Sequence, residues 1–455
     1  MSLRSVNPNN GSIVATYRVA SADSVREQLA RAAAAHRRWC TRSANERALA
    51  LRAIAAAIRR HADALAAMAT TEMGKPITAA QAEVEKCAVC CDWYAGQAHQ
   101  LTPVAGPKLG DEIRIDPLGV LFAIMPWNFP YWQVMRVLAP ALLLGNAVVL
   151  KHAENVTGCA LALRSVVRDA LSDDAGVFDV LLVTRDQALH IIASPDVAAV
   201  TLTGSERAGV SVASAAGVAL KPVVLELGGG SDPFLVWHDV DVPAVARAAA
   251  LARCVNNGQS CIAAKRFLIH DTIYDAFLQA FARAMQSLRM GDPLETATEL
   301  GPLVSIEARN ALHAQVQKTI DAGATVQLGC VIPDGNGAFY PPSIVSDIPE
   351  QSPMARDELF GPVAGVWRVH DLDDAIARAN STRFGLGASV WTNDADVAAR
   401  CASMFNAGTV MINQPVVSDP ALPFGGVKAS GYGRELGAAG LLAFANVKTV
   451  RGLTR

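Results

Sequence analysis

The sequence predicts an α/β protein with two domains, each a mostly parallel β-sheet covered by helices. Short apolar segments alternate with stretches of helical periodicity from residue 119 to Gly228-Gly229-Gly230, and the alternation restarts after these glycines. Alternation of this kind is typical of parallel sheets with helices on both faces. A chain of 455 residues is also too long for one hydrophobic core, which favours two or three domains.

The first part of the chain provides helices and then the alternating pattern. Apolar residues at helical spacing predict helices at 23–39, 44–73 and 77–100, and Gly74-Lys75-Pro76 separates the second from the third. An exposed strand is expected at 111–116. The strands that follow are expected at 119–125, 146–151, 178–183, 197–203 and 221–227, with helices at 155–171 and 205–216. This is the arrangement of a nucleotide-binding domain.

The second part repeats the pattern. Its strands are expected at 233–237, 265–270, 361–369, 387–392 and 408–413, and its helices at 241–257, 272–289, 305–322, 371–380 and 394–406. The tail at 442–452 has the pattern of a strand with little left to pair with in its own domain. A terminal strand of this kind often joins a neighbour's sheet, so we expect a homodimer or homotetramer.

The overall composition argues against several classes of partner. A net charge of −2 and a pI near 6.5 give no reason to expect nucleic acid or an anionic membrane. The most apolar stretch, at 137–150, is shorter than the ~20 residues of a membrane span, and the N-terminus lacks a signal peptide. The nine cysteines follow no disulfide or zinc-site spacing. We therefore expect a cytoplasmic protein with reduced thiols and no metal.

Two strand ends carry residues suited to binding or chemistry. Thr203-Gly204-Ser205 lies where a strand meets a helix, and its N–H groups suit a pyrophosphate, although a simple helix N-cap has the same pattern. No Gly-x-Gly-x-x-Gly motif is present. Glu226 ends a strand beside the three glycines. This position suits a general base that acts through water, although an ordinary strand-end charge has the same pattern.

Two loop residues suit covalent chemistry. Asn128 lies between Pro126 and Pro130, so its amide is held rigidly enough for an oxyanion site, although turn asparagines are common. Cys261 follows a polar turn and precedes a strand. It has no histidine nearby in sequence, which leaves both a nucleophile and a small core residue open.

Together these motifs follow the order found in the aldehyde dehydrogenase superfamily, which the whole chain resembles. The motifs are "PWNFP" (126–130), "TGS" (203–205), "LELGG" (225–229), "GQSC" (258–261), "ELFGPV" (358–363) and "PFGGVKASGYGRE" (423–435). The strings "MPWNFPYWQVMR", "LKHAEN" and "SDPALPFGG" are most similar to the succinate-semialdehyde dehydrogenase branch.

This resemblance implies an aldehyde dehydrogenase-like fold. It consists of two Rossmann-like α/β domains, one cofactor-binding and one catalytic, plus a small β oligomerisation element. The expected boundaries are 1–100 and 119–230 for the dinucleotide-binding domain, 231–430 for the catalytic domain, and 101–118 with 441–455 for the oligomerisation element.

The resemblance also implies the chemistry and the cofactor site. Cys261 would be the nucleophile, Asn128 an oxyanion donor, and Glu226 the base that activates water to hydrolyse the thioester. The implied cofactor-binding residues are Trp127, Lys151, Glu154, Gly204, Ser205, Glu358 and Phe360. Because Glu154 would repel a 2′-phosphate, NAD is favoured over NADP.

The substrate implied by the branch is succinic semialdehyde. Arg136 would bind its distal carboxylate, with Ser418 and Phe424 also contacting the substrate. Val255 stands where some members have a second arginine, and Asp419 would repel a carboxylate nearby. Uncharged aliphatic or aromatic aldehydes are the alternative substrates.

A catalytically silent binding protein on this scaffold is the alternative class of function. The presence of Cys261, Glu226 and Asn128 together argues against it.

Overall fold

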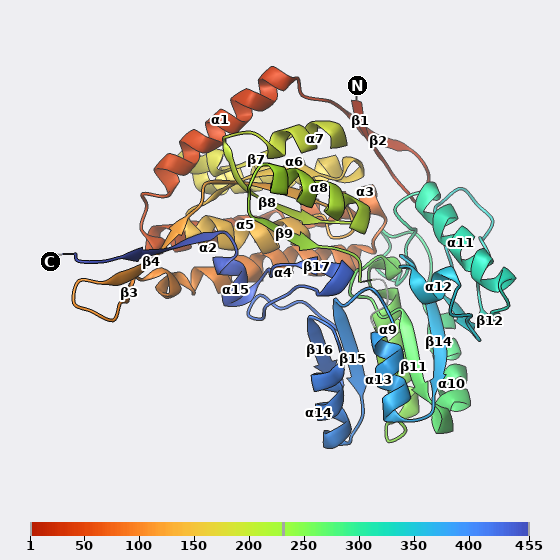
Figure 1. Cartoon of the computed structure of the whole chain (residues 1–455). Helices are drawn as coiled ribbons and strands as arrows, with labels where there is room; N and C mark the ends of the chain where they lie inside the picture. Colours follow the sequence, from red (N-terminus) through yellow and green to blue (C-terminus); the bar gives the residue numbers. More distant parts are fainter. Residues whose placement is uncertain (1, 230–232, 454–455) are drawn as a thin grey trace.

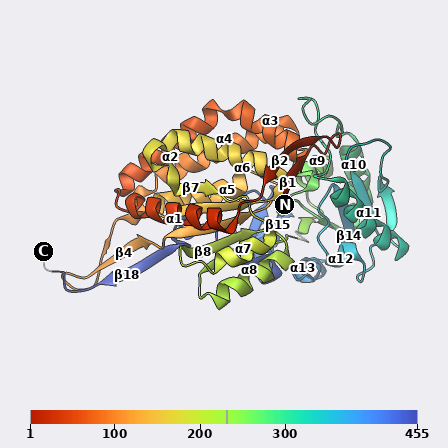
Figure 2. The ribbon, with the colours of Figure 1, turned by 90° about the horizontal axis from the view of Figure 1, so that it is seen from above.

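The computed structural model describes residues 2–229 and 233–453, and within them two large sheets form separate layers (Figure 1). Gly230, the additional glycine of the "LELGGG" segment, lies outside the described residues. Each large sheet has helices on its faces, so the α/β prediction is confirmed. A third, smaller sheet projects from the body of the molecule in both Figure 1 and Figure 2.

The first large sheet has the order β17-β9-β8-β5-β6-β7. Five of its strands are parallel, and the short β17 adds antiparallel to β9. The strands are β5 (Val120–Met125), β6 (Ala147–His152), β7 (Phe178–Val180), β8 (Val197–Thr203), β9 (Val223–Glu226) and β17 (Gly431–Tyr432). The C-terminal part of the chain therefore returns to complete the N-terminal sheet.

Helices cover this sheet and bury one large apolar core with it. They are α1 (Ala22–Trp39), α2 (Ala44–Arg60), α3 (Ala62–Met73), α4 (Ile77–Ala95), α5 (Trp132–Leu144), α6 (Thr157–Leu171), α7 (Arg185–Ile192), α8 (Glu206–Val218) and α15 (Gly437–Leu442). Ser43 begins α2 with a capping box to Glu46, and Ser205 caps α8, as hydroxyl side chains commonly do. The core also takes Phe424, Leu441 and Phe444 from the C-terminal segment.

The second large sheet has the order β12-β13-β14-β11-β10-β15-β16, parallel except for β12. Its strands are β10 (Pro233–Val236), β11 (Arg266–His270), β12 (Thr325–Leu328), β13 (Ser343–Ser346), β14 (Val363–Val369), β15 (Gly387–Trp391) and β16 (Thr409–Ile412). Its helices are α9 (Val242–Cys254), α10 (Tyr274–Gln286), α11 (Ile306–Asp321), α12 (Pro353–Arg356), α13 (Leu372–Asn380) and α14 (Ala395–Met404).

Two small antiparallel sheets complete the fold. β1 (Ser2–Val6) pairs with β2 (Ile13–Arg18) near the N-terminus. The projecting sheet has the order β18-β4-β3, with β3 at Val104–Ala105, β4 at Glu112–Pro117 and β18 at Ala445–Val450. The terminal strand thus pairs with β4 inside its own chain. Short 3-10 turns lie at Ala98–Leu101, Glu154–Val156, Ser172–Val177, Val255–Gly258, Asp271–Ile273 and Lys428–Ser430.

Several elements differ from the sequence prediction. The helix expected at 44–73 is two helices, because the backbone leaves helical geometry at His61. Helix α5 was not predicted, since every residue in it is buried and it contains Pro140, so it has no amphipathic pattern. The strands β1, β2, β12 and β13 and helix α7 were not predicted either.

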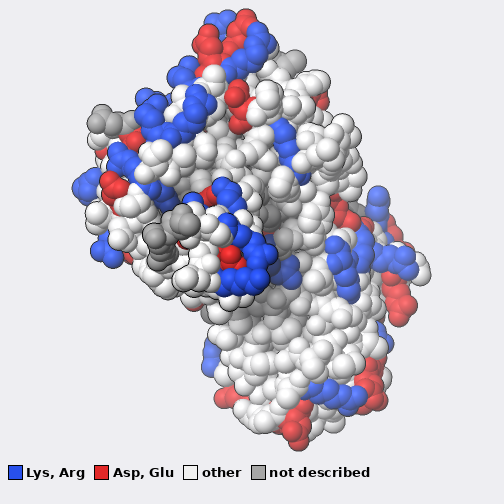
Figure 3. Space-filling model, turned by 60° about the vertical axis from the view of Figure 1, so that its left-hand side comes forward, with Lys and Arg blue, Asp and Glu red and all other residues white. Residues whose placement is uncertain are grey.

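No described helix is long and apolar enough to cross a bilayer, and no described group of His, Cys, Asp and Glu has the geometry of a metal site. On the face shown in Figure 3, cationic and anionic side chains lie interspersed among uncharged ones. All nine cysteines are free thiols.

Candidate active site

The loop before Cys261 has an unusual backbone. Asn256, Asn257 and Gly258 all have positive φ, at 54°, 59° and 73°. Asparagine and glycine adopt this left-handed region most readily, which explains the "NNG" sequence. A Cβ at Gly258 would collide with the backbone of Gly361 and Pro362. Glycine is therefore required there both for its conformation and for its lack of a side chain.

Buried side chains fix this loop in place. Asn257 donates from Nδ2 to the carbonyls of Gly74 and Pro302 at 2.9 Å each, and accepts from Gly301 N. Arg253 donates to Gly258 O at 2.7 Å. The loop that carries Cys261 is thus fastened to both large domains before any ligand binds.

Lys265 was not predicted as a site residue, yet it organises the loop that carries Cys261. Its ammonium donates to the carbonyls of Gly229, Ser260, Cys261 and Ala263 at 2.9–3.1 Å. A Cβ at Gly229 would collide with the Cys261 carbonyl, so these two segments touch. A lysine at the start of a buried strand is rare, and that rarity is the sequence signal for Lys265.

Asn128 lies against the same loop. Its Nδ2 donates to Gln259 O at 3.1 Å, and its own carbonyl accepts from Asn256 Nδ2 at 2.7 Å. His152 fixes the loop from the other side, with Nε2 2.8 Å from Pro130 O. Burial lowers the pKa of His152 to about 4, so the ring is neutral and bonds as a donor through one nitrogen. The amide of Asn128 is rigid, as an oxyanion donor needs.

Glu226 lies at the end of β9, opposite Gly431 of β17. Its side chain is buried and packs toward Gly425, Glu435 and Arg136, and it does not line the cavity that contains Cys261. Burial and the neighbouring Glu435 raise the pKa of the Glu226 carboxyl well above its usual range, opposed by Arg136 and Arg434. Gly228-Gly229 follows Glu226 closely in the chain, and Gly229 touches the Cys261 loop. The side chains of Glu226 and Cys261 therefore belong to adjoining segments.

A cavity of about 260 Å³ contains Cys261 together with all three predicted substrate residues. It is lined by Lys75, Ala79, Ala82, Glu83, Lys86, Phe129, Trp132, Gln133, Arg136, Val255, Asn256, Ser260, Cys261, Ile262, Val416, Val417, Ser418 and Phe424. Asp419 is exposed, accepts from Ala421 N, and does not line the cavity. Asp419 therefore lies outside the cavity, although its charge acts on Lys86, which lines it.

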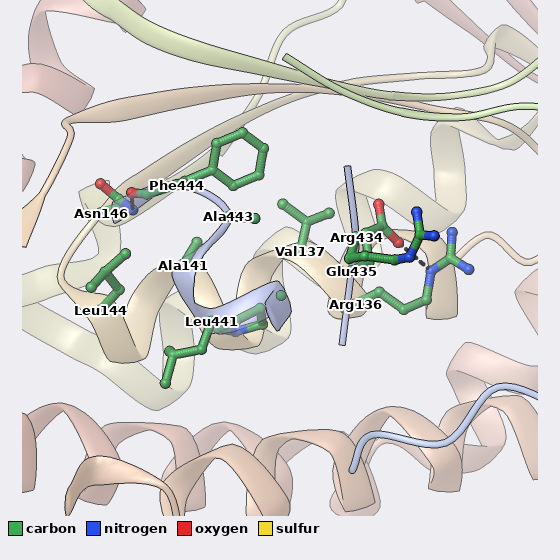
Figure 4. Close-up of a pocket in the computed structure, with 12 residues that line it drawn as sticks. Arg136, Val137, Ala141, Leu144, Asn146, Arg434, Glu435, Leu441, Ala443 and Phe444 are labelled. Carbon is green, nitrogen blue, oxygen red and sulfur yellow. Dashed lines mark hydrogen bonds and ion pairs between the residues drawn. The ribbon is translucent and has the colours of Figure 1, made fainter. Parts of the chain in front are cut away.

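Arg136 is already paired inside the protein. Its Nε lies 2.7 Å from Glu435 Oε2, and both side chains are at most 3% exposed (Figure 4). The guanidinium also stacks over Phe424, 4.8 Å from the ring centre, and Nη2 donates to Thr203 Oγ1 at 3.3 Å. Arg136 lines the same cavity as Cys261, but Glu435 neutralises its charge. The sequence did not indicate this partner.

A second cavity, of about 830 Å³, lies along the carboxyl ends of β5, β6 and β8. It contains five of the predicted cofactor residues: Trp127, Lys151, Glu154, Gly204 and Ser205. Burial lowers the pKa of Lys151, opposed by Glu154. Four cationic side chains and two carboxylates line this cavity. The cations are Arg4, Lys151, Arg185 and Arg207, and the carboxylates are Glu154 and Asp186. A phosphorylated dinucleotide fits this charge and the free N–H groups at the start of α8.

Glu358 and Phe360 line neither cavity, but each contacts a residue beside one of them. The Glu358 carboxylate is 3.4 Å from Lys265 Nζ, and a Cβ at Gly228 would lie 2.8 Å from its Oε2. Phe360 packs edge-on against Trp127, with 5.6 Å between ring centres. Trp127 lines the larger cavity, so these two residues border the region where a cofactor would approach Cys261.

Comparison with known proteins agrees with this architecture. The model of the aldehyde dehydrogenase family matches residues 1–450. This chain belongs to the aldehyde dehydrogenase family. The fold class, the enzyme class and the resemblance inferred from the motifs are thereby confirmed.

Individual relatives cover the full chain. The chain is 47% identical to "Succinate-semialdehyde dehydrogenase [NADP(+)]" of Mycolicibacterium paratuberculosis, covering 99% of this chain and 96% of that protein. It is 46% identical to "Succinate-semialdehyde dehydrogenase [NADP(+)] 1" of Mycobacterium tuberculosis H37Rv, covering 99% of each. A crystal structure of succinic semialdehyde dehydrogenase from Streptococcus pyogenes in complex with NADP+ has a TM-score of 0.96 at 34% identity, covering 99% and 100% of the chains.

The preference for NAD over NADP was wrong. These relatives are named as NADP+ enzymes, and the solved relative is in complex with NADP+. That preference rested on the negative charge of Glu154 and did not include the cationic side chains around it. Arg4, Arg185 and Arg207 come from three other elements of the chain, and they surround the same cavity with an excess of positive charge.

The buried pair of Arg136 and Glu435 gives a prediction about stability. Arg136→Leu leaves Glu435 buried without its cation, so we expect a loss of about 3–5 kcal/mol in the free energy of unfolding. The double variant Arg136→Leu/Glu435→Leu removes both charges and should recover most of that loss. Urea unfolding followed by circular dichroism measures both. A double variant no more stable than the single one would contradict the account.

Proposed function

We propose that the protein oxidises succinic semialdehyde to succinate, with NADP+ as the hydride acceptor. The observation that carries the proposal is the cavity in which Cys261 lies with Arg136 and Ser418. A short aldehyde with a carboxylate at its other end has one group for Cys261 and one for the polar side chains of the same cavity. The names of the full-length relatives support the same substrate and cofactor.

The chain's own residues account for the chemical steps. The Cys261 thiolate attacks the aldehyde carbon to give a thiohemiacetal, and Asn128 Nδ2 with the Cys261 backbone N–H stabilises its oxyanion. NADP+, held by Lys151, Glu154 and Ser205, would supply the hydride acceptor, and loss of hydride from the thiohemiacetal would leave a thioester on Cys261. Glu226 then takes a proton from the water that hydrolyses the thioester and releases the acid.

Glu226 reaches this position from the end of β9. It precedes Gly229, which touches the Cys261 carbonyl, by three residues, so the chain allows at most ~11 Å between the two backbones. Rotation about its side-chain torsions would turn the carboxylate from Glu435 toward Cys261. Burial and the neighbouring Glu435 raise the pKa of Glu226, which makes its carboxylate a stronger base.

For the cofactor, we propose that Ser205 and the start of α8 bind the pyrophosphate. Lys151 and Glu154 would meet the adenosine ribose, with Arg185 and Arg207 near the 2′-phosphate. Glu358 would bind the nicotinamide ribose, and Phe360 with Trp127 would hold the ring region. The dinucleotide-binding and catalytic domains would keep the boundaries given for them above, with β17 and α15 added to the first, and nine cysteines outside any disulfide suit a cytoplasmic enzyme.

Uncharged aldehydes are the second candidate substrates. Phe129, Trp132, Ile262, Val416 and Phe424 line the cavity and give it apolar walls. An aliphatic or aromatic aldehyde would bury its chain against them without needing a cation. Selectivity between charged and uncharged aldehydes therefore decides between the two substrate classes.

Formation of NADPH from succinic semialdehyde tests the proposal directly. We expect kcat/KM for succinic semialdehyde to exceed that for butanal at least tenfold at pH 7, because butanal replaces the carboxylate by a methyl group. We also expect NADP+ to give a higher kcat/KM than NAD+. Equal turnover of the two aldehydes would favour the uncharged substrates, and inactivity with both would overturn the assignment.

The role of Glu226 predicts a separation of the two half-reactions. In Glu226→Gln the acyl-enzyme should form but hydrolyse slowly, so a burst of about one NADPH per Cys261 should precede a steady state slowed by about 10²–10⁴-fold. Stopped-flow absorbance at 340 nm measures both phases. Cys261→Ala is the control and should show no burst. A Glu226→Gln enzyme with an unchanged steady state would refute the role.

The projecting sheet suggests a homo-oligomer. β18 is its edge strand, and Val104, Ile113 and Val447 on this sheet are 59%, 38% and 60% exposed. An exposed apolar edge strand is stable when another chain covers it. Sedimentation velocity should show a dimer or tetramer that Ile113→Lys/Val447→Lys weakens, whereas Val218→Lys on α8, exposed and outside this sheet, should not. A monomeric parent would contradict this.

A further inference from the structure

The charges inside the Cys261 cavity cancel in pairs, with one exception. Lys75 pairs with Glu83, and Arg136 pairs with Glu435. Lys86 of α4 lines the same cavity, and no carboxylate among the described residues forms an ion pair with it. Val255, which lines the same cavity, brings no charge. The uncompensated positive charge of the cavity is therefore that of Lys86.

Ser418 is held ready to donate a hydrogen bond. Its Oγ accepts from Lys86 Nζ at 3.0 Å and from Trp132 Nε1 at 3.1 Å. A serine hydroxyl has two acceptor positions and one donor, so both acceptor positions are used and only the O–H remains. Ser418 is 7% exposed and lines the cavity, where no described acceptor takes this proton. An anion in the cavity would satisfy it.

The Lys86 side chain is fixed by its neighbours. Its ammonium lies 4.4 Å from the centre of the Trp132 ring, in addition to its bond with Ser418. Trp132 itself lines the cavity and is held at the start of α5 by a bond from its backbone N–H to Glu83. Lys86, Trp132 and Ser418 thus form one preorganised cluster within the same cavity as Cys261.

We propose that Lys86 and Ser418 bind the distal carboxylate of the substrate, and that Lys86 provides the charge that selects a semialdehyde acid over an uncharged aldehyde. This rests on the proposed function and adds a specificity residue to it. Arg136, neutralised by Glu435, would shape the site and donate from its remaining N–H groups.

The surroundings of Lys86 make this recognition depend on pH. Burial and the facing Arg136 of α5 lower the pKa of Lys86 to about 8, while Cys87, Cys90 and the exposed Asp419 oppose the shift. Burial raises the pKa of the Cys87 and Cys90 thiols, so both are neutral near pH 8. The other charged groups of the cavity are the paired Lys75 and Glu83. Lys86 is therefore charged at pH 7 and mostly neutral at pH 9.5.

Substitution of Lys86 tests the charge directly. The measured quantity is the ratio of kcat/KM for succinic semialdehyde to kcat/KM for butanal, with NADP+, because effects on Cys261, Glu226 or the cofactor cancel in the ratio. At pH 7, Lys86→Met should lower the ratio about 10- to 100-fold, the range for loss of a charged hydrogen bond. Lys86→Arg keeps a cation and should retain most of the selectivity.

The pH dependence of the same ratio tests the parent enzyme without any substitution. Between pH 7 and pH 9.5 the ratio should fall by about tenfold or more as Lys86 loses its proton, because kcat/KM reports the free enzyme. In Lys86→Arg the ratio should stay nearly constant, since arginine remains charged over this range.

The outcomes separate this inference from the proposed function. A parent that prefers succinic semialdehyde, with a ratio unaffected by Lys86→Met in a variant of unchanged melting temperature, would overturn the role of Lys86 alone. If Lys86→Met does not fold, a parent ratio that is flat from pH 7 to 9.5 would overturn it in the same way. A parent without preference for succinic semialdehyde would overturn the proposed substrate first.

Discussion

The geometry of this site depends on the hydrogen bonds that the ammonium group of Lys265 donates. It bonds to the carbonyls of Ser260, Cys261 and Ala263 and also to that of Gly229, which follows the strand carrying Glu226. A lysine suits this role because its three N–H groups and compact charge can serve several carbonyl oxygens at once. The nucleophile loop of one domain and the glycine segment of the other are therefore tied by one side chain, with Glu358 beside it.

Paired charges form the frame of the cavity that contains Cys261, and we propose that Lys86, which has no ion-pair partner among the described residues, gives it selectivity. The Lys75–Glu83 and Arg136–Glu435 pairs are buried and connect α4, α5 and the C-terminal segment. Such pairs contribute little net stability but are costly to break, so they fix the walls of the cavity. Only a cation without a carboxylate partner gains a strong new electrostatic interaction when an anionic substrate binds. The neighbours of an arginine therefore matter as much as its presence in the cavity.

The sequence predicted the parts of the structure that depend on local pattern. Alternating apolar strands and helices indicated both large sheets, and the ordered motifs indicated Cys261, Asn128 and the residues of the larger cavity. Helix α5 was missed because it is buried on every side, which removes the polar face that a helical pattern needs. Glu435 was not recognised as the partner of Arg136, and Lys86 was not recognised at all, because both roles depend on contacts between distant segments. The wrong cofactor preference has the same origin, since the arginines around Glu154 come from β1, α7 and α8.

The return of the chain to its first sheet has a consequence for synthesis on the ribosome. β17 pairs with β9 beside Glu226, and Phe424, Leu441 and Phe444 enter the first core only from the C-terminal segment. At roughly 5–20 residues per second, the N-terminal sheet emerges well before these residues exist. During that interval the nascent domain exposes an unpaired β9 edge and an unfilled part of its core. This enzyme should therefore need protection from aggregation while it is being made, even though the finished fold encloses both features.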